Sequence, residues 1–249
     1  MRILKGALLA SLVITAAAAQ SPDAALSDAR LTVHTLLRED IFAGFMSNNM
    51  KRMARAERHI ELLLKERPAQ RANLLAWKAG TSMYRAVLAH EAGKPDEFER
   101  LFAEAREGFT DAAGLRSGHD GVAAITGGTL SVFADRLPEE HRAAAWSQAY
   151  DAYSILWKQQ GAGIERLPVH FKGEVLAGMA QSAQRTGRTD EAAQFLDRML
   201  LLLPNTPYEP TARQWKTDPA SASTTNLTCQ NCHNPGRLAA RLEALEKGK

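Results

Sequence analysis

Residues 173–204 read GEVLAGMAQSAQRTGRTDEAAQFLDRMLLLLP, and this stretch indicates the architecture most strongly. Apolar and small residues recur at spacings of three and four on both sides of Gly187, which predicts two helices joined by a turn. Ala180 and Ala192 place small side chains where the two helices would approach each other. Pro204 ends the second helix, because proline cannot continue one. The segment therefore predicts an antiparallel helical hairpin.

The hairpin follows a frame of about 34 residues that starts at Gly173 and resembles the tetratricopeptide repeat. The residues at the diagnostic places of this frame are Ala180, Gly187, Ala192, Leu196 and Pro204. A second frame, starting at Leu37, has the corresponding residues Gly44, Ala56 and Pro68. The resemblance covers most of residues 30–205, with one good repeat and several degenerate ones. A generic helical bundle is the alternative.

The remainder of the chain also reads as helices separated by glycine and proline, with few strand-forming runs. In the expected helix at 95–113, an apolar stripe consists of Phe98, Leu101, Phe102, Ala105, Phe109 and Ala112. The expected helix at 138–160 has a similar stripe of Trp146, Ala149, Tyr150, Tyr153 and Trp157. The other expected helices span 24–47, 50–67, 70–92, 120–135, 168–187 and 189–203. We therefore predict an all-α fold, a tetratricopeptide-like array of helical hairpins with a C-terminal haem-binding tail.

The N-terminus has the features of an export signal. Arg2 and Lys5 precede an apolar run over 6–19, and the small residues at 17–19 form an A-x-A cleavage site. The run is shorter than the roughly 20 residues that cross a bilayer, although a membrane anchor or a core helix is the alternative. We expect residues 1–19 to be a signal peptide, with a periplasmic or secreted mature chain that has no membrane span. The formal charge of +3, without basic clusters interleaved with aromatics, gives no indication of nucleic-acid binding.

After residue 205 the pattern changes. The segment is predicted to be an irregular connector, because it is punctuated by Pro207, Pro210 and Pro219, with Pro204 just before it, and has a small polar run over 220–225. A short helix over about 235–247 then follows, with Asn234 as its N-cap and Pro235 as its first residue. The expected organisation is a signal peptide over 1–19, a helical domain over 20–205, and a connector with a haem-binding segment over 206–249.

Residues 229–233 read Cys-Gln-Asn-Cys-His and contain both cysteines of the chain. This pattern resembles the attachment signature of c-type cytochromes. The resemblance implies one covalent haem c, held by thioethers from Cys229 and Cys232, with His233 as the proximal iron ligand. A zinc site would normally need a fourth ligand, and a thioredoxin-like pair usually accompanies a βαβ pattern. A simple disulfide between the two cysteines is a further alternative.

The motif lies near Lys249, whereas small mono-haem cytochromes c carry it near the N-terminus with a methionine ligand downstream. Cytochromes c′ are similar in its late position, but they are much shorter. Neither Met nor His follows His233, so any protein sixth ligand must come from the helical domain. The candidates are His34, Met46, Met50, Met53, His59, His90, His119, His141, His170, Met179 and Met199. An open iron is an equal alternative, and Arg237 and Arg241 are either partners of the haem propionates or solvated helix charges.

The whole chain also resembles a bacterial family of exported proteins that combine the two features, and this resemblance implies no defined activity. We favour an electron carrier over an enzyme, with the repeat domain docking a redox or assembly partner. One alternative is a haem peroxidase or small-gas sensor with an open iron. Another is a scaffold in which the haem is structural.

Overall fold

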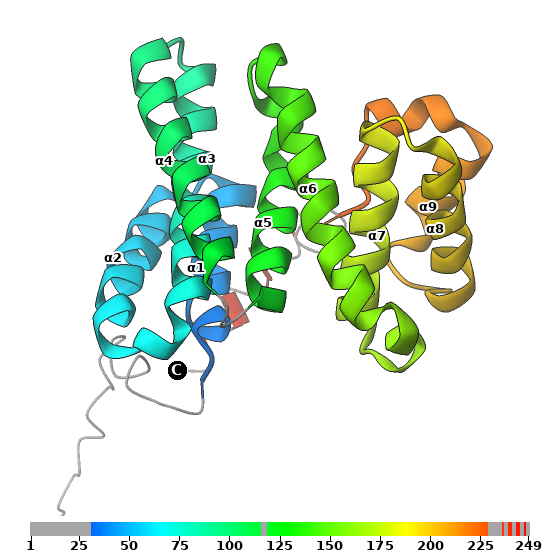
Figure 1. The fold of residues 1–249 in the computed structure, drawn as a ribbon, viewed down its shortest axis with the longest axis horizontal. Helices are drawn as coiled ribbons and strands as arrows, with labels where there is room; N and C mark the ends of the chain where they lie inside the picture. The colour runs from blue at the N-terminus through cyan, green and yellow to red at the C-terminus, as the bar shows by residue number, and fades with distance from the viewer. Residues whose placement is uncertain are drawn as a thin grey trace, which may run out of the picture.

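A computed structural model describes residues 31–115 and 119–228, together with positions 236, 239, 240, 243, 244 and 247. Throughout the described residues the regular structure is helical, without strands, which confirms the all-α prediction (Figure 1). The predicted signal peptide at 1–19 lies outside the described residues. Within them, no helix combines the length and apolar character that crossing a membrane requires.

The first eight α-helices agree closely with the ranges expected from the sequence. They are α1 (Val33–Ser47), α2 (Met50–Glu66), α3 (Arg71–Glu91), α4 (Pro95–Gly114), α5 (His119–Phe133), α6 (Glu139–Gln160), α7 (Val169–Arg185) and α8 (Thr189–Leu202). Only the first differs at its start. Thr32 caps α1 by accepting a hydrogen bond from the Thr35 N–H, so the helix begins at Val33 rather than at residue 24. Residues 24–30 lie outside the described part of the chain.

The connector is more regular than we predicted. It contains α9 (Glu209–Thr217) and a 3₁₀ helix at Pro219–Ser223. The prolines do not prevent this, because Pro210 and Pro219 lie in the first turn of their helices, where a missing N–H costs no hydrogen bond. Helix α9 packs on α8 and buries Ala212 and Trp215. The prediction of an irregular segment was therefore wrong for residues 209–223.

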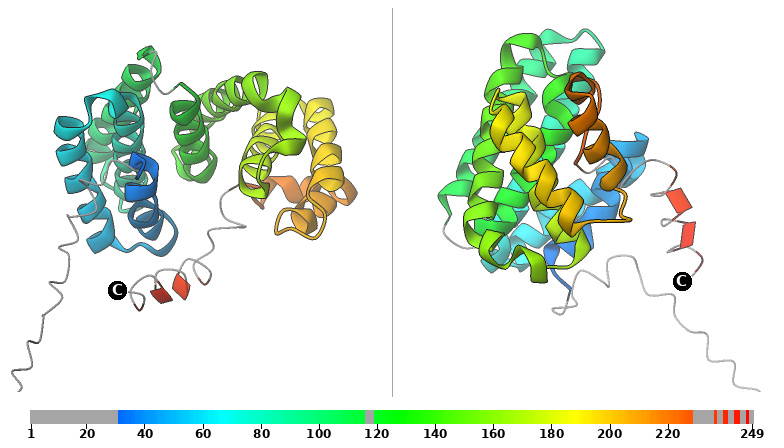
Figure 2. Two further views of the ribbon diagram at one scale, coloured as in Figure 1. Left: turned by 90° about the horizontal axis from the view of Figure 1, so that it is seen from below. Right: turned by 90° about the vertical axis from the view of Figure 1, so that its right-hand side faces the viewer.

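Consecutive helices pair as hairpins: α1 with α2, α3 with α4, α5 with α6, and α7 with α8. The hairpins stack because α1, α3, α5 and α7 also contact one another in that order, and they follow an arc in the left view of Figure 2. Gly187 makes the α7–α8 turn with a positive φ of 76°. Ala56 and Ala192 are buried, as the two frames predict.

Two clusters of buried side chains fill the fold. The first lies among α1 to α6, and the second is formed by α5 to α9 with residues of the connector. The predicted stripe of α4 is fully buried, whereas Tyr150 and Trp157 of α6 are only partly buried. Gly127 lies against the Tyr153 ring, so the Gly127-Gly128 pair marks a close helix contact within an uninterrupted α5.

Candidate functional site

The motif residues Cys229, Cys232 and His233 lie outside the described residues, as do Arg237 and Arg241. The described chain reaches Thr228, the residue directly before Cys229. Leu227 and Thr228 are both buried, so the chain is placed within the fold up to the start of the motif. The surroundings of Thr228 therefore define where the described chain meets the motif.

Gln181 of α7 holds this segment through its side-chain amide. Its Oε1 accepts hydrogen bonds from the backbone N–H groups of Leu227 at 2.7 Å and Thr228 at 3.0 Å. Its Nε2 donates to Asn226 Oδ1 at 2.7 Å. Gln181 is fully buried, so these bonds satisfy an amide that would otherwise be costly to bury. We refer to Gln181 and residues 226–228 as the tail clamp.

The connector that leads to the tail clamp is also fixed. Trp215 Nε1 donates to Thr225 Oγ1 at 2.7 Å. Arg185, one turn after Gln181 on α7, donates to the carbonyl of Ala222 and forms an ion pair with Asp135 at 2.9 Å. These contacts attach the connector to α7 and to the turn after α5.

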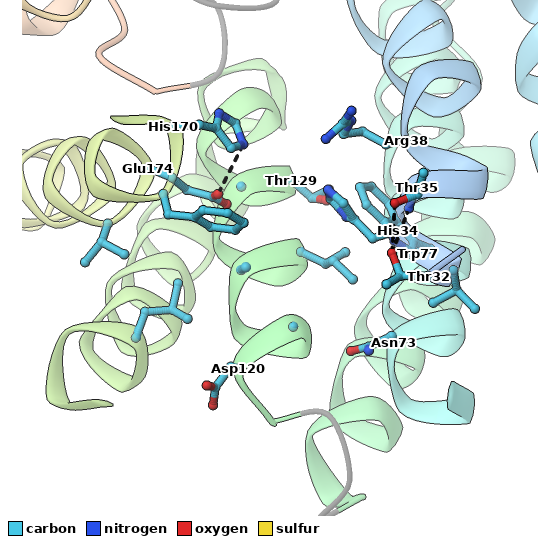
Figure 3. Close-up of a pocket in the computed structure, with 18 of the residues that line it drawn as sticks. Thr32, His34, Thr35, Arg38, Asn73, Trp77, Asp120, Thr129, His170 and Glu174 are labelled. Carbon is cyan, nitrogen blue, oxygen red and sulfur yellow. Dashed lines mark hydrogen bonds and ion pairs between the residues drawn. The ribbon is translucent and has the colours of Figure 1, made fainter. Parts of the chain in front are cut away.

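Thr228 lines a cavity of about 490 Å³ enclosed by α1, α3, α5 and α7 (Figure 3). This volume lies in the range of cofactor and ligand sites, roughly 300–1,000 Å³. Its aromatic and aliphatic lining comes from helices far apart in the sequence: Val33, Phe42, Phe45, Trp77, Ile125, Leu156, Phe171, Val175 and Tyr208. The cavity therefore offers a mostly apolar, concave surface beside the start of the motif.

Two pairs of polar side chains face each other across the cavity, and Asp120 of α5 lies apart from both pairs. Figure 3 shows His170 and Glu174 of α7 on one side and His34 and Arg38 of α1 on the other. His170 Nε2 is 3.8 Å from a carboxylate oxygen of Glu174. The His34 ring lies 5.4 Å from that of Trp77, centroid to centroid, with an angle of 31° between the planes.

The carboxyl group of Glu174 has a pKa well above its ordinary value. Burial raises the pKa of its carboxyl group from 4.5 to about 7, and the positive charge of Arg38 partly opposes this rise. Although 23 % of the side chain is exposed, the group faces the concave cavity rather than open solvent, so desolvation dominates. Near neutral pH, Glu174 can therefore either give up or accept a proton.

Of the eleven candidate sixth ligands, the cavity brings together His34 and His170. The other four histidines lie elsewhere: His59 is buried on α2, His119 pairs with Gln159, and His90 and His141 pack on Phe98. The methionines belong to the cores, either buried within them or packed against their edges: Met46, Met50, Met53, Met179 and Met199. None of these nine residues lines the cavity.

The residues of the cavity fit a large, planar and mostly apolar group with a few charged substituents. The apolar walls would cover its faces, and Arg38 is a suitable partner for carboxylates. Two buried polar atoms of the lining, Trp77 Nε1 and Asn73 Oδ1, have no hydrogen-bond partner within the part of the chain that the structure describes. Both atoms have almost no accessible surface, so they lie within the packed wall rather than open to the cavity.

Within residues 31–115 and 119–228, no set of three or more His, Cys, Asp or Glu side chains is placed to hold a metal ion. Comparison of the chain with models of protein families, with curated proteins and with solved structures finds no match.

The sequence pattern predicts no site role for Gln181, Glu174, Arg38 or Trp77. Gln181 and Glu174 had a weak signal, because both are polar residues in the otherwise apolar run over 173–183. A polar side chain in such a position is either exposed or held by a partner. For Arg38 and Trp77 no local signal exists, since the α1 and α3 walls of the cavity are set by helix packing.

Proposed function

We propose that this chain is an exported, periplasmic or secreted mono-haem c-type cytochrome-like protein that transfers electrons. In this proposal Cys229 and Cys232 attach the haem, His233 is its proximal ligand, and the cavity receives it. One observation carries the proposal. Thr228, fixed by the tail clamp directly before the motif, lines an apolar cavity that also contains two histidines.

The chain's own residues have separable tasks in this proposal. Gln181 holds the backbone before Cys229, which limits where the attached group can lie. The apolar walls exclude water from it, and exclusion of water is one of the ways in which a protein sets a reduction potential. Arg38 offers a positive charge to its carboxylates. The haem itself would supply one-electron exchange.

The hairpin array supplies a docking surface in the same proposal. Stacked hairpins leave extended surfaces that suit a protein partner, and such repeat domains bind through them. A redox or assembly partner would dock there, while the haem remains on the inner side of the array between α1 and α7.

A second candidate is a haem enzyme or small-gas sensor, which His170 and Glu174 favour. Peroxide chemistry requires a positioned proton-transfer group as well as an open iron. Glu174, with a pKa near 7 and a histidine at 3.8 Å, is such a group within the cavity. This candidate requires that no protein side chain fills the sixth position of the iron.

The test is to export the full chain in a host with haem-attachment machinery and to extract it with acid acetone. Thioethers are covalent, so the haem should remain with the protein, and its mass should equal that of a chain starting at Gln20 plus one haem. Changing both Cys229 and Cys232 to Ala should make the haem extractable or absent. Asn231→Ala is the matched control, because it keeps the thiols and their spacing. A purified exported protein with its polypeptide mass alone would refute the proposal.

A further inference from the structure

Most of the titratable side chains of the cavity lie toward one end of it. Arg38 of α1 and Glu174 of α7 lie there with His34 and His170, whereas Asp120 of α5 lies apart from them (Figure 3). The remaining walls are mostly aromatic and aliphatic. A ligand that fits this space therefore needs an apolar body with its polar group at one end.

Arg38 supplies a permanent positive charge at this end. Its Nε and Nη2 each lie 3.1 Å from Glu39 Oε1, and Glu39 lies outside the cavity lining. These contacts use two of the five N–H donors of the guanidinium, which is directed from α1 into the cavity (Figure 3). Its charge also reaches Glu174, whose carboxyl pKa it lowers against the effect of burial. This end suits a carboxylate, because arginine N–H donors match carboxylate oxygens.

Glu174 faces Arg38 from the α7 wall and determines when an anion is accepted. Burial raises the pKa of its carboxyl group to about 7, so below neutral pH the group is mostly protonated. A protonated carboxyl group does not repel an acidic ligand and has one O–H to donate to it. An ionised Glu174 competes with the ligand for Arg38, so we expect binding of an acid to weaken above about pH 7.

The walls beyond the charged end suit an apolar ring system. Trp77 of α3 and Val175 of α7 are buried side chains of the lining, on helices far apart in the sequence. Phe171 also lines the cavity, yet 53 % of it is exposed. A bound apolar group would shield the Phe171 ring from water, and removing apolar surface from water favours binding.

We propose that the cavity binds a mostly apolar carboxylic acid, with its carboxylate on Arg38 and its apolar body between the α3 and α7 walls. The site consists of described residues alone, so it is complete without the motif. Two sources can supply this chemistry: the propionate-bearing haem of the proposed function, or a diffusible acid. The site goes beyond the proposed function, because it recognises the chemical class whether or not a haem is attached.

The first test uses the full chain with Cys229→Ala and Cys232→Ala, shown to be haem-free by its absorption spectrum. It is titrated calorimetrically at pH 6 with 2-naphthoate and with 2-naphthalenemethanol, the matched neutral ligand. The acid should bind at least about 10-fold more tightly, because charge-assisted hydrogen bonds are the stronger ones. Arg38→Gln should remove most of this preference and Arg38→Lys should keep part of it. Arg100→Gln, on the exposed face of α4, is the matched control and should leave it unchanged.

Glu174→Gln, made in the same haem-free background, tests the opposite wall. The chain with Glu174 should lose affinity for 2-naphthoate between pH 6 and pH 8, and the variant should lose less. The other titratable side chains of the lining are His34, Asp120, His170 and Tyr208. These are the same in both proteins, so the difference between the two profiles reports Glu174. Identical profiles would overturn the part assigned to it.

Equal affinity for the acid and the alcohol, or an Arg38→Gln variant that keeps the preference, would overturn the site. The same titration on the chain with covalent haem, verified by mass, distinguishes the two sources. Loss of 2-naphthoate binding would identify the haem as the occupant, and retained binding would identify a diffusible acid; both results agree with the site. Covalent haem without acid binding to the haem-free chain would overturn this inference alone. Acid binding to a chain that never carries covalent haem would overturn the proposed function alone.

Discussion

Replacing Gln181 with Leu should release the segment that precedes the motif. The substitution keeps the side-chain volume nearly constant but removes the acceptor of two buried backbone N–H groups, those of Leu227 and Thr228. Each buried donor left without an acceptor costs about 1–3 kcal/mol. The lower bound for the two together is about 2 kcal/mol, which corresponds to a roughly 30-fold increase in the population of the detached segment.

Hydrogen exchange measured on these two amides reports the detachment directly. In Gln181→Leu both amides should exchange roughly 30-fold faster or more, whereas amides in the middle of α3 should change little. Gln184→Leu is the matched control, since Gln184 lies on the same helix and is partly exposed. Equal protection of Leu227 and Thr228 in the wild type and Gln181→Leu would show that the clamp does not hold the segment.

Three further predictions concern stability. The pKa of Glu174 is about 7 in the folded protein and 4.5 in the unfolded chain. Between these pH values the folded protein keeps a proton on Glu174 that the unfolded chain releases. The contribution of Glu174 to the free energy of unfolding is therefore fully present below pH 4.5 and is lost as the pH rises to about 7. In urea unfolding, Glu174→Gln should abolish this slope and be more stable than wild type at pH 8 by up to about 3 kcal/mol; an unchanged pH profile would contradict the shift. Ala192→Trp should overpack the α7–α8 contact and lower the free energy of unfolding by about 1–3 kcal/mol. Ala193→Trp, on the exposed face of α8, should leave the free energy of unfolding nearly unchanged, and equal losses in the two variants would contradict this packing. Gly178→Ala places a methyl group into the Tyr153 ring and should lower the melting temperature, and an unchanged melting temperature would show that this contact is loose.

The hairpins are predictable from the sequence because their determinants are local. Gly187 terminates α7 through a conformation that glycine adopts readily, and the small side chain of Ala192 lies one turn into the next helix. Helix α9 escaped prediction because prolines near its ends resemble those of a loop. Its stability comes from burying Trp215 and Ala212, and that contact depends on where α8 lies.

The site likewise has a part that is predictable from the sequence and a part that is not. The Cys-Gln-Asn-Cys-His pattern is contiguous and therefore visible in the sequence. Its surroundings depend on contacts between distant segments: His34 and His170 share one cavity, and Gln181 reaches the backbone of Leu227. No periodicity indicates which histidines face the same space, so the sequence alone left eleven candidate ligands.

The cavity lies where the two hydrophobic cores adjoin, and this position has a thermodynamic consequence. Its α1 and α3 walls, with Val33 and Trp77, belong to the first core, and Val175 and Tyr208 belong to the second. A group that binds both walls stabilises the contact between the two cores by its binding free energy. Helices α5 and α6 contribute side chains to both cores, so the two cores should unfold in one transition. Filling the cavity should raise the temperature of that transition, so calorimetry of the helical domain reports whether the space is occupied.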